Sequence, residues 1–154
     1  MKYAFILILV FTVACTQTNR VPKEEDFVVT VKAVDESLKS NEGIEIVAGL
    51  VNKSKNNIKI LHGSPLIHVQ IYDEQNKPLI SIFAIDQIGI YHNIQPDEFY
   101  NADIKSFNGG KRMIKVEKPG KYTLVATASF SIELSGKERK DFKVLSEPVE
   151  IIVE

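Results

Sequence analysis

KPGKYTLVATASFSIEL, residues 118–134, alternates apolar and polar side chains along most of its length. Because successive side chains of a β-strand point to opposite faces, this period of two predicts one long strand with a single buried face. SGKERKDFKV (135–144) turns the chain back, and PVEIIV (148–153) closes it with a further strand. This part of the chain therefore predicts antiparallel β-structure.

Toward the N-terminus, the sequence has further predicted strands, which are runs rich in β-branched residues separated by turn-forming residues. They are FVVTVKAV (27–34), IEIVAGLVN (44–52), IKILHG (58–63), LIHVQIYD (66–73) and PLISIFAI (78–85). Shorter strands are expected around 88–94, 98–105 and 112–116. No stretch keeps apolar residues at helical spacing over three turns. The sequence predicts an all-β fold, an antiparallel β-sandwich of about eight or nine strands.

Tyr122 stands at the entrance to the long strand, directly after Pro119-Gly120-Lys121. This placement resembles the tyrosine corner of immunoglobulin-like sandwiches, in which the hydroxyl bonds back to the preceding loop. The antibody-type disulfide signature is absent, because position 124 is leucine and the chain has no tryptophan. The resemblance implies an immunoglobulin-like sandwich without its disulfide.

The first fifteen residues, MKYAFILILVFTVAC, carry one positive residue, Lys2, and then an apolar run from Tyr3 to Val13. This run is shorter than the roughly 20 residues that span a bilayer, so it predicts a secretory signal peptide over residues 1–14. TQTNRVPKEE follows and, with Cys15, predicts a polar tether over residues 15–25. The folded domain is expected over residues 26–154.

Cys15 is the chain's only cysteine, and it directly follows Phe11-Thr12-Val13-Ala14. This stretch resembles the lipobox of bacterial lipoproteins, with Thr12 where that family usually has leucine. The resemblance implies a diacylglyceryl group on Cys15 and a lipid anchor on the extracytoplasmic face of a bacterial cell membrane, whether the cell has one membrane or two. Two alternatives stay open: a secreted protein with a free thiol, and an uncleaved chain with a buried Cys15.

GLVNKSKNNIKILHGSPLIHVQIYDEQNKPL (49–79) resembles the intracellular proteinase inhibitor family, of the BsuPI type, which is also an immunoglobulin-like sandwich. The positions that carry the resemblance are Asn52, Ser54, Gly63, Ser64, Tyr72, Asp73 and Lys77, with Ile94–Glu98 as a later turn. The resemblance implies the same fold and, as a function, protease inhibition. From its residues, Asn52-Lys53-Ser54 is interpreted as a turn.

Catalytic and metal-binding patterns are sparse in this sequence. There is no G-x-S-x-G, no H-E-x-x-H and no glycine-rich phosphate loop, and an acylated Cys15 could not serve as a nucleophile. The chain has three histidines that lie well apart in the sequence: His62, His68 and His92. The acidic residues of the middle segment do not have the spacing of a calcium-binding loop; they are Asp86, Asp97, Glu98 and Asp103. We expect a protein that is not an enzyme and has no cofactor and no metal site.

The remaining expectation concerns partners. The formal net charge of −1 provides no field for nucleic acid. LISIFAIDQIGIY (79–91) is either core on both faces, the favoured interpretation, or a binding patch formed by Ile82, Phe83, Ile85, Ile88, Ile90 and Tyr91. We expect an accessory module that binds the bilayer through Cys15 and an unknown protein, peptide or wall polymer elsewhere. The alternative is a protease inhibitor or a carrier of a small ligand or metal.

Overall fold

The computed structural model describes residues 20–35, 37–79, 86–107, 110–134 and 138–154. Nine strands account for most of these residues: β1 (Phe27–Ala33), β2 (Gly43–Asn52), β3 (Ile58–Tyr72), β4 (Asp86–Ile94), β5 (Phe99–Tyr100), β6 (Arg112–Lys115), β7 (Gly120–Glu133), β8 (Arg139–Leu145) and β9 (Val149–Val153). A 3-10 turn, η1 (Glu24–Asp26), and a one-turn helix, α1 (Asp103–Ser106), add short helical segments. The predicted all-β sandwich is confirmed.

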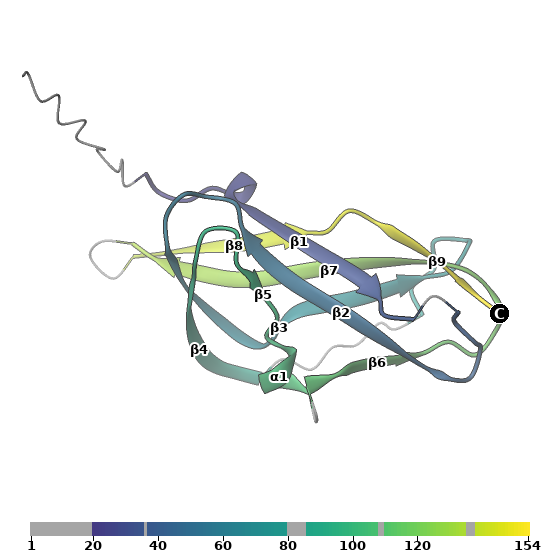
Figure 1. Ribbon diagram of the computed structural model, residues 1–154. Coiled ribbons are helices and arrows are strands. Elements are labelled where there is room, and N and C mark those ends of the chain that lie inside the picture. Colours follow the sequence, from purple (N-terminus) through teal and green to yellow (C-terminus); the bar gives the residue numbers. More distant parts are fainter. Residues whose placement is uncertain (1–19, 36, 80–85, 108–109, 135–137) are drawn as a thin grey trace, which may run out of the picture.

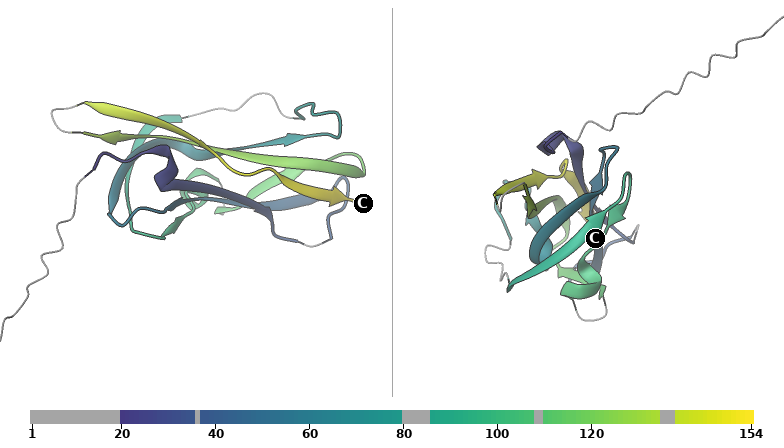
Figure 2. Two further views of the ribbon diagram at one scale, coloured as in Figure 1. Left: turned by 90° about the horizontal axis from the view of Figure 1, so that it is seen from above. Right: turned by 90° about the vertical axis from the view of Figure 1, so that its left-hand side faces the viewer.

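The strands form two antiparallel sheets that pack as layers (Figure 2). In the four-stranded sheet, β2 is central, with β1 on one side and β5 and β6 following one another on the other side. The five-stranded sheet has the order β4-β3-β7-β8, and β9 also pairs with β7. A parallel bridge between Val29 of β1 and Ser146, which follows β8, connects the two sheets.

Alternation in the sequence decides which side chains enter the core. Along β1, Phe27, Val29 and Val31 are buried while the residues between them are exposed. Along β7, every second residue from Tyr122 to Ile132 is buried, and the residues between them are half-buried apart from the exposed Ser129. Burying a side chain of this size contributes roughly 1.5–3 kcal/mol, so each buried residue of these rows helps to hold the two sheets together.

Three phenylalanines connect the two sheets near the start of β1. The ring of Phe27 lies 4.9 Å from that of Phe130 and 5.6 Å from that of Phe142, edge to face in both cases. Phe130 and Phe142 are stacked at 5.2 Å. Aromatic contacts of this kind add about 0.5–1.5 kcal/mol beyond the area they bury.

The two strands expected at 58–63 and 66–73 form one strand, β3, which corrects the sequence prediction. Gly63-Ser64-Pro65, with a cis peptide before Pro65, forms an irregularity inside the strand and does not end it. The register of pairing with β7 shifts between His62 and Ile67, and pairing then resumes. Partners on both sides hold the strand together across residues that would break an isolated strand.

The strand expected at 98–105 is also corrected. Only Phe99 and Tyr100 pair with β2, and α1 follows. The side chain of Asp103 is buried and accepts hydrogen bonds from the guanidinium of Arg112 at 2.7 and 3.3 Å. Asn101 accepts the amide hydrogen of Asp103 at 2.8 Å, which stabilises the turn. A buried ion pair therefore outweighs the strand propensity of this segment.

The sandwich is elongated and has two distinct ends (Figure 1). The proximal end, defined by residues 20–26, 53–57 and 95–98, is where the described chain begins. The distal end, defined by residues 73–79, 115–122 and Glu154, lies at the other end of β7. At the proximal end, residues 20–25 of the predicted tether contact the domain: Arg20 pairs with Asp26, and Lys140 Nζ donates to the carbonyl of Pro22 at 3.0 Å.

Candidate functional site

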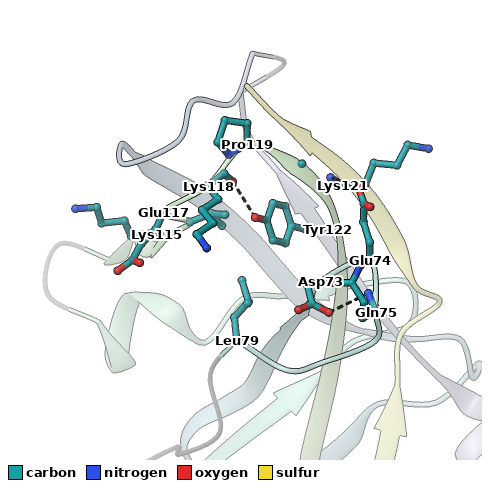
Figure 3. A pocket seen from close by; sticks show the side chains of 12 residues that line it. Asp73, Glu74, Gln75, Leu79, Lys115, Glu117, Lys118, Pro119, Lys121 and Tyr122 are labelled. Carbon is teal, nitrogen blue, oxygen red and sulfur yellow. Dashed lines mark hydrogen bonds between the residues drawn. The ribbon is translucent and has the colours of Figure 1, made fainter.

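The distal end is hollowed by a depression of about 610 Å³ between two connections (Figure 3). One wall is the turn after β3, and the other is the segment that joins β6 to β7. The residues that line it are Asp73, Glu74, Gln75, Leu79, Lys115, Val116, Glu117, Lys118, Pro119, Gly120, Lys121 and Tyr122. We take this depression, the distal pocket, as the candidate binding site because concave sites of this size hold ligands or peptide segments.

The first wall is a rigid turn because Asp73 organises it. Its Oδ1 accepts the backbone N–H of Gln75 at 3.0 Å and that of Lys77 at 2.8 Å. The backbone of Asp73 and Lys77 closes the same turn at 3.0 Å, with Asn76 in the left-handed region at φ 58°. Asparagine tolerates this conformation better than most residues, so the sequence Asp-Glu-Gln-Asn-Lys forms the turn without strain.

The second wall is held by Tyr122. Its hydroxyl donates to the carbonyl of Lys118 at 2.8 Å, which is the contact expected from the tyrosine corner (Figure 3). The ring is buried, with 8% exposure. The backbone N–H of Lys121 donates to Oε1 of Glu74 at 3.3 Å and so joins the two walls. The distal pocket is therefore shaped before any ligand arrives.

The chemistry of the distal pocket is charged and balanced. It contains three carboxylates and three ammonium groups. Asp73 and Glu74 are used in the turn contacts, and Lys121 Nζ lies 3.3 Å from Glu150. Within the described part of the chain, the side chains of Lys115, Glu117 and Lys118 form no ion pair and no hydrogen bond.

These three side chains are the charged groups of the pocket that are available to a ligand. Two ammonium groups beside one carboxylate can pair with a ligand that carries acidic and polar groups, such as a peptide or a charged polymer. The residues that line the pocket include no histidine, serine or cysteine.

A second polar cluster lies between the sheets. His62 of β3 is buried; its Nδ1–H donates to the carbonyl of Gly63 at 2.6 Å, so its Nε2 accepts the hydrogen bond of the Tyr100 hydroxyl at 3.1 Å. The ring of His92 stacks on Tyr100 at 3.7 Å, and its Nε2 lies 3.0 Å from Glu98 Oε1. This cluster joins the β3–β4 edge of one sheet to β5 of the other.

The electrostatics of this cluster favour a neutral His62. Burial lowers the pKa of His62, the bond to Gly63 opposes this, and the positive charges of His92 and Lys105 lower the pKa further. Nothing in the described ranges groups three His, Cys, Asp or Glu side chains as metal ligands. The cluster is therefore interpreted as an inter-sheet contact.

The predicted patch at 79–91 is only partly covered by the structure. Ile82, Phe83 and Ile85 lie outside the described residues. Ile88 is 70% exposed and Tyr91 47%, so the core interpretation is wrong for these two, while Ile90 is half-buried.

The Tyr91 side chain is held by polar neighbours. Its hydroxyl donates to Glu133 at 2.7 Å, and Lys59 Nζ lies 4.3 Å from the centre of its ring. The described part of the patch is therefore partly covered by charged groups.

Cys15 and the whole signal segment lie outside the described residues. Among the helices of the described ranges, none has the length and apolar character needed to cross a bilayer. The sequence does not indicate the distal pocket, although it draws attention separately to Asp73 and Lys77, as positions of the family resemblance, and to the corner at Tyr122. Nothing local in the sequence indicates that these two segments lie side by side, because they are about 45 residues apart.

Comparison with protein-family models gives no match, and neither does comparison with curated proteins. Among solved structures, the chain is similar to one described as the X-ray structure of Northeast Structural Genomics Consortium target SoR45. The two share 14% sequence identity with a TM-score of 0.48, over 84% of this chain and 88% of that chain.

Proposed function

We propose that this chain is a lipid-anchored lipoprotein whose domain binds a protein, a peptide or a wall polymer outside the bacterial membrane, without catalysing a reaction. The lipobox-like sequence before Cys15 supports the anchor. One observation carries the binding role. Arg20, five residues after Cys15, pairs with Asp26 at the proximal end, whereas the distal pocket is lined by residues of the distal end. In Figure 1 the described chain begins at one end of the sandwich and β9 runs to the other end.

The length of the sandwich separates these two features. β7 runs from Gly120 at the distal pocket to Glu133, which lines a surface hollow together with Arg20. A strand rises by about 3.3 Å per residue, so its 14 residues span about 45 Å. A domain anchored at its proximal end would hold the distal pocket well clear of the lipid headgroups.

The contacts of residues 20–26 support a defined orientation. Arg20 pairs with Asp26, whose carboxylate also accepts the N–H of Lys23 at 2.8 Å. The N–H of Lys53 donates to the carbonyl of Asp26 at 2.7 Å, and Lys140 reaches Pro22. Only residues 16–19 then separate the anchored cysteine from a segment that is fixed to the domain.

The pocket itself supports recognition by charge. Lys115 and Lys118 provide two ammonium groups that no carboxylate of the described chain neutralises. Both lysines are exposed to solvent, so each ion pair with a ligand contributes at most about 1 kcal/mol, and two such contacts together favour an acidic ligand.

The test is cross-linking in intact cells followed by affinity purification of the full chain from membranes. The variant Lys115→Glu/Lys118→Glu should lose the specific co-purified partner. The matched variant Lys55→Glu/Lys143→Glu has the same change of charge outside the pocket and should keep it. A partner retained by both variants would contradict the proposal, and so would inhibition of a secreted protease by the chain, which favours the inhibitor alternative.

A further inference from the structure

We propose that the distal pocket binds a peptide segment in which an acidic residue stands beside a large apolar residue, in preference to a uniformly charged polymer. This choice rests on the proposed function, because it names the class of ligand for the same pocket. Three features of the two walls carry it: a fixed backbone, balanced charges and an exposed apolar side chain next to a free ammonium group.

The backbone of the second wall is fixed because its carbonyl groups already accept hydrogen bonds from the domain. The carbonyl of Val116 accepts the backbone N–H of Asn41 at 2.8 Å, and the carbonyl of Glu117 accepts Nδ2 of Asn41 at 3.1 Å. The carbonyl of Lys118 accepts the hydroxyl of Tyr122 at 2.8 Å. A ligand therefore meets a preorganised wall that offers chiefly its side chains.

The charges of the distal pocket do not favour a uniformly charged polymer. Its three carboxylates and three ammonium groups sum to a net charge of zero. A polyanion that is held by Lys115 and Lys118 also approaches Glu117, which lies between them in the sequence, so repulsion offsets part of the attraction. A peptide can use both signs, because its carboxylate pairs with a lysine while its backbone N–H groups donate to a carboxylate.

Leu79 adds an apolar contact beside these charges. Its backbone N–H donates to the carbonyl of Ile71 at 2.9 Å, which fixes its position, and its side chain is 44% exposed. In Figure 3 the side chains of Leu79 and Lys118 point into the space between the two walls. Covering the exposed part of a leucine is favourable, and a peptide can place an apolar side chain there beside an acidic one. A polymer of sugar or phosphate units has no such pair of side chains.

The expected selectivity is modest because both contacts lie at the surface. An exposed ion pair changes a dissociation constant by about fivefold at most. Contact with the exposed part of Leu79 should contribute a factor of similar size, about three- to fivefold. The two preferences should be independent of each other, since one is electrostatic and the other apolar.

The experiment measures equilibrium binding of labelled peptides to the purified full chain by fluorescence anisotropy. The probe is a short peptide with a leucine followed by a glutamate between glycine and serine residues. One comparison peptide has glutamine in place of the glutamate, and another has serine in place of the leucine. We expect the probe to bind about three- to fivefold more tightly than either comparison peptide.

Two variants assign these preferences to the pocket. Lys118→Gln should abolish the preference for glutamate over glutamine and keep the preference for leucine over serine. Leu79→Ser should abolish the preference for leucine and keep the preference for glutamate. Lys55→Gln, at an exposed position of the proximal end, is the matched control and should keep both preferences. Because all three positions are exposed, the variants should melt at the temperature of the natural chain.

A glutamate preference that survives Lys118→Gln, or a leucine preference that survives Leu79→Ser, would overturn the proposal. Tighter binding of poly(glycerol phosphate) than of the probe peptide would also overturn it, and so would the absence of binding by every probe. The proposed function fails on a different result, namely a membrane partner that is retained by Lys115→Glu/Lys118→Glu. The two failures can therefore be distinguished.

Discussion

The ring of Phe99 occupies the space that a side chain at position 49 would fill, since a Cβ on Gly49 would meet its Cε2 at 2.1 Å. Gly49→Val should therefore destabilise the domain by about 1–3 kcal/mol, although valine favours strands. Gly49→Val/Phe99→Ala should be more stable than the sum of the single changes predicts, because the clash is removed. Urea unfolding of the four chains checks this, and additive effects would contradict it.

Asn52 is fully buried and organises the turn that follows β2. Its Nδ2 donates to the carbonyls of Asn56 at 2.8 Å and Ile94 at 3.0 Å, and its Oδ1 accepts the N–H of Ser54 at 2.9 Å. Asn52→Ala leaves these groups unpaired and should lower the free energy of unfolding by about 2–4 kcal/mol. Asn57→Ala, at an exposed neighbour, should change it by less than about 0.5 kcal/mol. Similar losses in both variants would be evidence against this role.

The pair Arg112–Asp103 is buried on both sides and also holds the carbonyl of Ile67. Arg112→Met leaves a buried carboxylate uncompensated and should destabilise the domain by about 3–5 kcal/mol. Asp103→Leu/Arg112→Met should recover much of that loss. The exposed pair Lys111–Glu45 is the control, and Lys111→Met should shift the free energy by less than about 1 kcal/mol. Chemical denaturation measures the free energy of unfolding of each variant. A double variant that is less stable than Arg112→Met would refute the explanation.

His62 makes the stability depend on pH. Burial lowers its pKa below the ordinary 6.5, so the unfolded chain binds the proton more readily than the folded one. Stability is complete above pH 6.5 and declines as the pH falls from 6.5 toward the folded value. Comparing urea unfolding at pH 7.5 and 5.5 should show a smaller loss for His62→Gln than for the natural chain.

Two other titratable groups, His68 and Glu98, also change the stability with pH and must be distinguished from His62. Burial also lowers the pKa of His68, so part of the decline should remain in His62→Gln and disappear when His68→Gln is added. The pKa of Glu98 is lowered, chiefly by its bond to the Gln95 backbone, so its contribution is lost only as the pH falls below 4.5. An unchanged pH dependence in His62→Gln would show that the buried imidazole is not its source.

Alternation along β1 and β7 was enough to predict the fold class, because one residue in two must enter the core of a sandwich. The continuity of β3 could not be predicted, since Gly63 and Pro65 are local breakers and the strand is held by partners far away in the sequence. The helical turn at Asp103 was missed for the same reason: its cause is a buried contact with Arg112.

The candidate site was less predictable than the fold. The Asp73 turn and the Tyr122 corner each have a local signature, but their proximity depends on the pairing of Tyr72 with Thr123 in the five-stranded sheet. Val28, Val51 and Phe99 likewise lie side by side across the four-stranded sheet only because of its pairing register. Local patterns indicate elements, and long-range pairing decides which surfaces they form.

The most direct test of the account is the intact mass of the protein extracted from membranes. We expect a mature chain of the 140 residues from Cys15 to Glu154, with the mass of a diacylglyceryl group on its first residue. The Cys15→Ala chain should show no lipid mass and should leave the membrane or remain unprocessed. A natural chain that begins elsewhere, or that carries a free thiol at Cys15, would contradict the membrane anchor on which the proposed function rests.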